Sequence, residues 1–219
     1  MARPLEGPRL PSRSGTTRQL VVFLHGYGAD GNDLIDLGQS WADILPDAAF
    51  VSPHAPEPCG MSPMGRQWFE LTFRNPDERW RGVNRAGPDL DAFLTLELER
   101  YRLPADNLAL VGFSQGAMMA MHVGLRRLDQ PGAIVAYSGH LVGPDHLKAE
   151  AKGAPPLLLV HGDQDNIIPI DALFDAMTAF GKAAIPCQWH LSAGVGHGID
   201  PEGLRHGGEF IAQNLGPRR

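Results

Sequence analysis

The sequence predicts a single α/β domain, spanning residues 1–219, in which a mostly parallel β-sheet is covered by helices on both faces. Short apolar runs that are typical of strands alternate along the chain with stretches of helical periodicity. The strands are apolar at consecutive positions, as expected when both faces of a sheet are buried. A length of 219 residues suits one domain with a sizeable core, and no linker-like stretch divides it.

The N-terminal part begins with residues 1–18, which are rich in proline and arginine and are expected to form a loose extension or a short edge strand. Residues 19–25 are a short apolar run rich in valine and phenylalanine, which predicts a buried strand. Apolar residues then recur at helical spacing through residues 34–45, and Pro46 ends this predicted helix. A second strand is expected at residues 48–52.

Residues 53–84 show no clean periodicity and contain five prolines. A segment of this length without regular structure is usually functional in a compact domain, often as a lid or a pocket wall. Its methionine and aromatic residues indicate that it packs on the rest of the domain. We therefore expect a long loop over the active site.

The remaining chain continues the alternation of strands and helices, assigned by the same two patterns. Strands are expected at residues 108–111, 132–138, 156–161 and 185–191, and helices at residues 89–101, 115–128, 170–180 and 201–215.

Composition and charge exclude several functions. A formal net charge of −6 argues against a nucleic-acid or anionic-membrane partner, and no apolar run is long enough for stable membrane insertion. Cys59 and Cys187 give no disulfide framework, and the first twenty residues lack the apolar core of a signal peptide. A cytoplasmic protein without cofactor or metal is therefore expected, because no cluster has metal-ligand spacing. A homodimer is compatible with this composition.

The candidate catalytic centre is the pentapeptide Gly112-Phe113-Ser114-Gln115-Gly116, which follows an apolar strand and precedes a small-residue helix. This G-x-S-x-G pattern is typical of a sharp turn that exposes a nucleophilic serine. We expect side chains at the two glycine positions to collide with neighbouring strands. The following helix directs its first N–H groups and its positive dipole end at Ser114.

A serine nucleophile needs a base and a group that orients the base, in the chain order serine, acid, histidine. Two carboxylates, Asp163 and Asp165, follow the strand at residues 156–161. Asp165 lies farther out and can reach a neighbouring loop, so it is assigned as the acid and Asp163 as its structural partner. His197 follows the last strand in a loop of small residues, which makes it the candidate base.

An oxyanion hole requires two N–H donors, one after the nucleophile and one in the loop after an early strand. Gln115 supplies the first donor by position. The loop His25-Gly26-Tyr27-Gly28 follows the first buried strand, and its Tyr27 supplies the second. The imidazole of His25 is expected to be structural.

Five motifs in this order resemble one family. The chain is similar to the phospholipase/carboxylesterase family of α/β-hydrolases, which includes the acyl-protein thioesterases and bacterial carboxylesterases. The resemblance implies Ser114, Asp165 and His197 as a catalytic triad, and the N–H groups of Tyr27 and Gln115 as the oxyanion hole. Ala117 departs from the family, in which many members carry a second glycine there. The motifs are Leu24-His25-Gly26-Tyr27-Gly28, Gln67-Trp68-Phe69-Glu70, Gly112-Phe113-Ser114-Gln115-Gly116, His161-Gly162-Asp163-Gln164-Asp165 and Gly196-His197-Gly198.

Met61, Met64, Trp68 and Ile167 are the candidate substrate contacts, because flexible thioethers and apolar groups suit an acyl chain. Trp68 has the alternative role of fixing the long loop to the sheet. The chain has no room for a separate cap domain, so an open site is expected.

The sequence therefore predicts a serine hydrolase that cleaves carboxylic esters of short-to-medium acyl chains, the substrate being a small-molecule or lipid-like ester. An acyl-protein thioesterase and a lysophospholipase are the alternatives within this class. A non-catalytic ligand-binding protein with the hydrolase fold is the alternative from another class.

Overall fold

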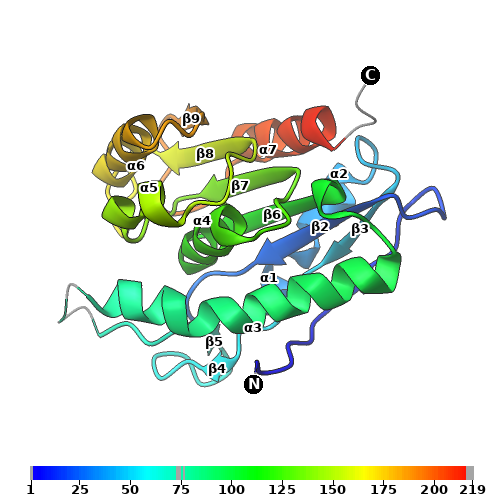
Figure 1. Ribbon diagram of the computed structural model, residues 1–219, viewed down its shortest axis with the longest axis horizontal. Helices are drawn as coiled ribbons and strands as arrows, with labels where there is room; N and C mark the ends of the chain where they lie inside the picture. Colours follow the sequence, from blue (N-terminus) through cyan, green and yellow to red (C-terminus); the bar gives the residue numbers. More distant parts are fainter. Residues whose placement is uncertain (1, 73–74, 76, 216–219) are drawn as a thin grey trace.

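The computed structural model describes residues 2–72, 75 and 77–215, and these form one seven-stranded sheet with helices on both sides (Figure 1). The strand order is β1-β3-β2-β6-β7-β8-β9. Strand β1 is antiparallel to its neighbour, and the other strands are parallel. The mostly parallel α/β sheet expected from the sequence is therefore confirmed, and the carboxyl ends of its central strands lie along one edge.

The strands of the main sheet are β1 (Arg9–Leu10), β2 (Gln19–Leu24), β3 (Ala48–Val51), β6 (Leu108–Phe113), β7 (Ala133–Tyr137), β8 (Leu157–Gly162) and β9 (Gln188–Ser192), while β4 (Glu57–Pro58) and β5 (Arg66–Gln67) form a separate hairpin. The helices are α1 (Gly31–Ile35), α2 (Leu37–Trp41), α3 (Glu78–Tyr101), α4 (Gln115–Arg126), α5 (Leu147–Glu150), α6 (Asp171–Lys182) and α7 (Pro201–Asn214).

Two hydrophobic clusters cover the two faces of the sheet. Side chains of β2 alternate between them: Leu20 and Val22 face the cluster formed with α3, α4, α5 and α6, whereas Val21 and Phe23 face α1, α2 and α7. Because both faces are covered, the central strands are apolar at consecutive positions, as in residues 20–24 of β2 and residues 157–160 of β8. None of the helices in the described part of the chain combines the length and the hydropathy of a membrane span.

The N-terminal segment is attached to the domain, so the expectation of a loose extension is wrong for its described part. The alternative of a short edge strand is confirmed at Arg9–Leu10, which pairs with β3. The Arg3 Nε donates to Asp89 at 2.7 Å, and the Arg9 guanidinium pairs with the buried Glu97 at 2.6 Å. These contacts with two acidic residues of α3 hold the segment across that helix.

Helix α3 begins at Glu78, so the helix expected at residues 89–101 and the loop expected at residues 53–84 both had wrong boundaries. The first turns were missed because their buried face consists of small residues, which give a weak apolar periodicity. A Cβ at Gly82 would lie 2.3 Å from the Phe69 ring. Residues 73, 74 and 76 of the expected loop lie outside the described residues.

The single helix expected at residues 34–45 is two short helices, α1 and α2. Asp36 ends the first and begins the second, and its carboxylate accepts from the Gln39 side chain at 2.7 Å. The close approach of α2 to the sheet depends on Gly38, because a Cβ there would lie 2.7 Å from the Phe50 ring.

His25, directly after β2, is a fully buried polar side chain. The Ala55 N–H donates to His25 Nε2 at 3.0 Å, so Nδ1 carries the proton and donates to the Gly26 carbonyl at 2.8 Å. Burial lowers the pKa of His25 to about 4, against an ordinary value of 6.5. The folded protein therefore keeps this imidazole neutral, and the imidazole fixes the backbone on either side of it.

We expect acid to destabilise the fold through His25. Its folded-state pKa lies below its unfolded-state value, so stability is lost as the pH falls from about 6.5 to about 4, by roughly 3 kcal/mol. In urea unfolding between pH 7 and pH 4, His25→Gln should lose less stability than the wild type. His54→Gln, which changes a partly exposed histidine, is the matched control. Parallel pH dependences in the wild type and His25→Gln would contradict the assignment.

Candidate active site

Ser114 occupies the sharp turn between β6 and α4, at the carboxyl edge of the sheet. Its backbone has φ 53° and ψ −115°, a left-handed conformation that non-glycine residues rarely adopt. A Cβ at Gly116 would lie 1.8 Å from the Leu24 carbonyl oxygen of β2, as expected. The expectation for Gly112 is wrong, because a Cβ there would meet the first turn of α4, 2.3 Å from the Gly116 carbonyl oxygen, and not a strand.

Ala117, the departure from the family, is accommodated by a glycine opposite it. A Cβ at Gly139 would lie 2.5 Å from the Ala117 Cβ. The methyl group at residue 117 therefore occupies space that a side chain at residue 139 would need, and α4 keeps its close packing on the sheet.

The structure brings Ser114, His197 and Asp165 together from three loops. His197 Nε2 lies 3.0 Å from Ser114 Oγ, and His197 Nδ1 lies 2.7 Å from Asp165 Oδ2. The Nδ1–H donates to the carboxylate, which leaves Nε2 to accept from the serine hydroxyl. The imidazole also packs on the Phe113 ring at a centroid distance of 4.9 Å. A hydroxyl, an imidazole and a carboxylate are thus in hydrogen-bonding sequence, which is the arrangement that nucleophilic catalysis by serine requires.

Asp165 is buried and carries its negative charge through compensating hydrogen bonds. Burial alone would raise its pKa, but the hydrogen bond from His197 and the N–H groups of Ile168 and Ile167 outweigh burial and lower it from its ordinary value. Both N–H groups donate to Oδ1 at 2.9 Å. The carboxylate therefore stays ionised. In this state it can accept the hydrogen bond from His197 Nδ1 that fixes the orientation of the imidazole ring.

Asp163 has a different partner. Its Oδ1 accepts from the Gly194 N–H at 2.7 Å, and its own N–H donates to the Ser192 carbonyl at 3.1 Å. Asp163 thus connects the end of β8 to the segment of residues 193–200 that carries His197. No hydrogen bond or ion pair joins Asp163 to His197 among the described residues.

The loop of Tyr27 lies beside Ser114. A Cβ at Gly26 would come within 3.4 Å of the Ser114 Cβ. Within the described chain, neither the Tyr27 N–H nor the Gln115 N–H donates to another residue, so both remain available to a ligand. Burial and a hydrogen bond with Cys59 raise the pKa of the Tyr27 phenol to about 12. The phenol therefore stays neutral and links this loop to residues 59–65.

The side chain of Gln115 was not singled out from the sequence, although it holds the site together. Its Nε2 donates to the Phe69 carbonyl at 2.8 Å, and its Oε1 accepts from the Trp68 N–H at 2.9 Å. The Trp68 indole N–H in turn donates to the His25 carbonyl at 3.0 Å. The sequence singled out Gln115 only for its backbone N–H, and the long-range partners of its side chain are not visible in sequence.

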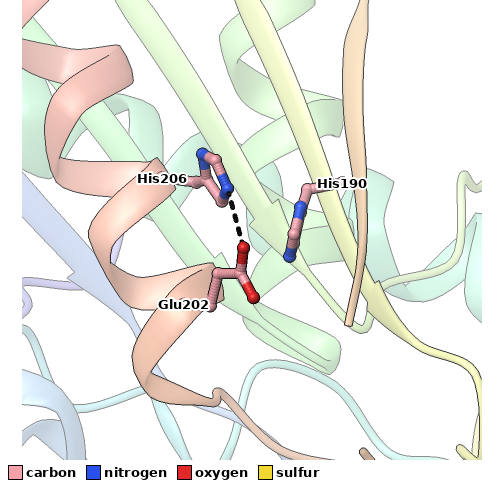
Figure 2. Close-up of side chains that lie close together, drawn as sticks. All are labelled: His190, Glu202 and His206. Carbon is pink, nitrogen blue, oxygen red and sulfur yellow. Dashed lines mark ion pairs between the residues drawn. The ribbon is translucent and has the colours of Figure 1, made fainter. Parts of the chain in front are cut away.

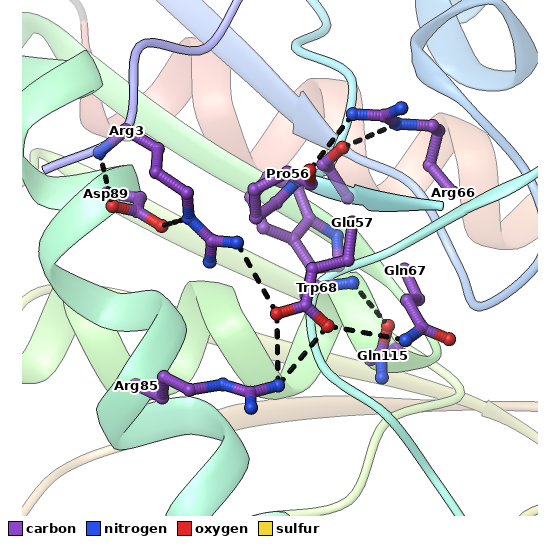
Figure 3. A network of polar contacts seen from close by, with 10 residues as sticks. Arg3, Pro56, Glu57, Arg66, Gln67, Trp68, Arg85, Asp89 and Gln115 are labelled. Carbon is purple, nitrogen blue, oxygen red and sulfur yellow. Dashed lines mark hydrogen bonds and ion pairs between the residues drawn. The ribbon is translucent and has the colours of Figure 1, made fainter. Parts of the chain in front are cut away.

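A network of polar contacts around Glu57 lies next to the hydrogen bonds of Gln115 and Trp68 (Figure 3). Glu57 pairs with Arg85 at 3.0 Å and with Arg3 at 3.4 Å, and it accepts from the Gln67 side chain at 3.3 Å. The Arg66 guanidinium donates to two backbone carbonyls just before Glu57, at 2.8 and 3.1 Å. The hairpin of β4 and β5 is thereby fixed to α3 and to the N-terminal segment.

The four candidate substrate contacts differ in exposure. Met61 and Met64 are 81% and 91% exposed, and Ile167 is 65% exposed, next to the acid of the site. Trp68 is fully buried, so its expected contact with substrate is wrong. Its alternative role is the one observed, since the indole fixes the long loop to the His25 carbonyl.

Comparison with known proteins agrees with this geometry. The sequence profile of the phospholipase/carboxylesterase family matches residues 6–215. The chain is 28% identical to esterase YpfH of Escherichia coli over 188 residues, which cover 86% of this chain and 79% of that protein. It is 26% identical to acyl-protein thioesterase 1 of Saccharomyces cerevisiae, over 96% of this chain and 99% of that protein.

The crystal structure of esterase PE8 superimposes with a TM-score of 0.93 at 44% identity, covering 97% of this chain and all of that one. Together with the match over nearly the whole sequence, this similarity establishes the fold and the kind of reaction. The chain belongs to the phospholipase/carboxylesterase family of α/β-hydrolases and is a hydrolase that acts on esters.

Proposed function

We propose that Ser114 is the nucleophile and His197 the general base of this hydrolase, with Asp165 as the orienting acid. The hydrogen-bonded series from Asp165 through His197 to Ser114, at 2.7 and 3.0 Å, is the observation that carries the proposal. His197 takes the hydroxyl proton as Ser114 attacks the ester carbonyl, and then protonates the leaving alcohol. Water repeats the sequence on the acyl-enzyme and releases the acid.

The tetrahedral intermediates carry a negative charge on the former carbonyl oxygen. We assign the N–H groups of Tyr27 and Gln115 as its donors. Neither N–H has a partner among the described residues, Gln115 follows Ser114 directly, and the Gly26-Tyr27 loop lies beside Ser114. The positive end of the α4 dipole adds to this stabilisation, since α4 begins at Gln115. The Gln115 side chain has a positioning role, because its hydrogen bonds hold the backbone of residues 68 and 69 against the Ser114 turn.

The proposed substrate is a carboxylic ester of short-to-medium acyl chain, either small or lipid-like, in a cytoplasmic setting. The proposal is supported by the exposure of Met61, Met64 and Ile167, apolar side chains that suit an acyl group better than a charged one. An acyl-protein thioesterase activity is the second candidate, because a relative that the chain matches along its length carries that name. Lysophospholipase activity and a homodimer stay predictions from sequence.

Removal of the nucleophile tests the proposal directly. Ser114→Ala should abolish labelling by a fluorophosphonate probe and lower kcat on p-nitrophenyl esters by about 10⁴- to 10⁶-fold, because only binding and oxyanion stabilisation remain. Ser138→Ala, which changes another buried serine near the end of a strand, is the control and should keep labelling. Labelling of folded Ser114→Ala protein would overturn the assignment.

The two carboxylates of the β8 loop are separable by mutation. Asp165→Asn should lower kcat by about 10⁴-fold, because the amide no longer holds the imidazole in the reactive tautomer. Asp163→Asn should act mainly through the 193–200 segment and leave kcat within about tenfold of the wild type. Steady-state kinetics with a urea unfolding curve for each variant make the comparison. A larger kcat defect in Asp163→Asn than in Asp165→Asn would reverse the roles.

The substrate class is tested by a chain-length series of p-nitrophenyl esters beside the matching acyl-thioesters. We expect the highest kcat/KM on short-to-medium esters, and Met61→Ser together with Met64→Ser should reduce kcat/KM for the longer members while sparing acetate. The single change Leu128→Ser, at an exposed residue just beyond the C-terminal end of α4, is the control. Faster turnover of the thioesters would favour the second candidate, with Ser114 chemistry unaffected.

A further inference from the structure

A second cluster of chemically reactive side chains lies between β9 and α7. His190 projects from β9, while Glu202 and His206 lie four residues apart on one side of α7, and the three converge (Figure 2). One nitrogen or oxygen atom from each residue lies within 4.8 Å of the other two. The sequence did not indicate this group, because its members belong to a strand and a helix and lack a short ligand spacing.

The three side chains of this cluster form no hydrogen bonds with one another. His190 Nε2 is buried and has no hydrogen-bond partner within the described residues. His206 Nε2 lies 3.7 Å from the Glu202 carboxylate, which is too long for a hydrogen bond, and the two imidazole rings lie 4.3 Å apart between centroids. Three acceptor-capable groups thus face one space, and the Arg205 Nη2, 4.0 Å from the Glu202 carboxylate and 3.2 Å from His206 Nε2, is the donor beside two of them.

Arg205 is the competing group. Its Nη2 lies 3.2 Å from His206 Nε2, whereas its Nη1 donates to Glu209 at 2.7 Å. The two contacts exist together, and the ion pair with Glu209 can hold the guanidinium when His206 turns toward His190. Because Arg205 is cationic, it opposes the binding of a positive ion at this position.

Two imidazoles and one carboxylate form a ligand set suited to zinc and to related late first-row metal ions. Zinc binds such atoms at about 2.0 to 2.2 Å, which places tetrahedral ligand atoms about 3.3 Å apart. The widest separation here, at most 4.8 Å, must therefore close by about 1.5 Å. Rotation of the exposed Glu202 and the partly exposed His206 side chains can supply this movement.

We propose that His190, Glu202 and His206 form a binding site for Zn²⁺ or a related divalent transition-metal ion, with water in the fourth position. The site contains no member of the Ser114 triad, so the metal takes no part in acyl transfer. It joins β9 and α7, which flank the segment of residues 193–200 that carries His197. Ser192 and Asp200, at the two ends of that segment, are already connected by a hydrogen bond of 2.5 Å.

Calorimetric titration of tag-free, chelator-stripped protein with ZnCl₂ tests the site. We expect one equivalent to bind, and His190→Ala and His206→Ala to weaken binding by more than the 10- to 100-fold typical of lost outer-shell partners. Glu202→Gln should also weaken it, and this exposed position carries little risk to folding. Glu99→Gln, at an exposed glutamate of α3, is the matched control, and Arg205→Gln should tighten binding.

Two further measurements separate a built site from adventitious binding. Co²⁺ should give the intense visible absorption of a four-coordinate ion in the wild type and not in His190→Ala. Saturating Zn²⁺, at about a hundredfold excess over Kd, should raise the Tm of the wild type by roughly 5 °C or more and leave that of His206→Ala unchanged. Equal Zn²⁺ affinity in the wild type and both histidine variants, or no saturable binding, would overturn the proposal.

Discussion

The strained turn at Ser114 is the constraint on which the site depends. A left-handed conformation at a serine costs on the order of 1–3 kcal/mol, and it persists only where the surrounding packing fixes it. Here β6 leads into the turn from the middle of the sheet, and the Ser114 N–H donates to the Tyr137 carbonyl of β7 at 2.9 Å. Glycines at positions 112 and 116 let α4 lie directly on this turn and on the end of β2. The hydroxyl and the Gln115 N–H are therefore positioned by the same packing.

Around this turn, the site is an arrangement of buried charge and preformed hydrogen bonds. Asp165 keeps a carboxylate out of water only because three N–H donors reach it, one of them from His197. Asp163, two residues earlier, uses its carboxylate on the backbone of the histidine loop. The two neighbouring acids thus have different roles. Asp163 fixes the loop that carries His197, and Asp165 orients the His197 ring. The cost of burying Asp165 is offset by contacts that also orient His197.

The sequence was sufficient for the parts of the fold that repeat a local pattern. Strand positions, the sheet class and the residues that meet at Ser114 follow from apolar runs, glycine turns and chain order. The start of α3 could not be predicted, because Gly82, Val83 and Ala86 form a buried face without large apolar side chains. Nor could the bonds from Gln115 to residues 68 and 69, since they join segments more than forty positions apart. Local sequence patterns indicate which secondary structure a segment prefers, whereas contacts between distant segments are defined only by the folded chain.

The loop of residues 59–65 is fixed at its base and free at its tip. At the base, the Cys59 N–H donates to the Gly65 carbonyl, and Arg66 exchanges backbone hydrogen bonds with the loop of Gly28 and Ala29. At the tip, the Met61 and Met64 side chains are largely exposed to solvent. Changes in tip side chains are therefore expected to be nearly neutral for folding, while they alter the surface that we propose as the contact for the acyl group. Successive substitutions at the tip of such a loop can change substrate preference during evolution without destabilising the fold. The residues around Ser114 need not change with them.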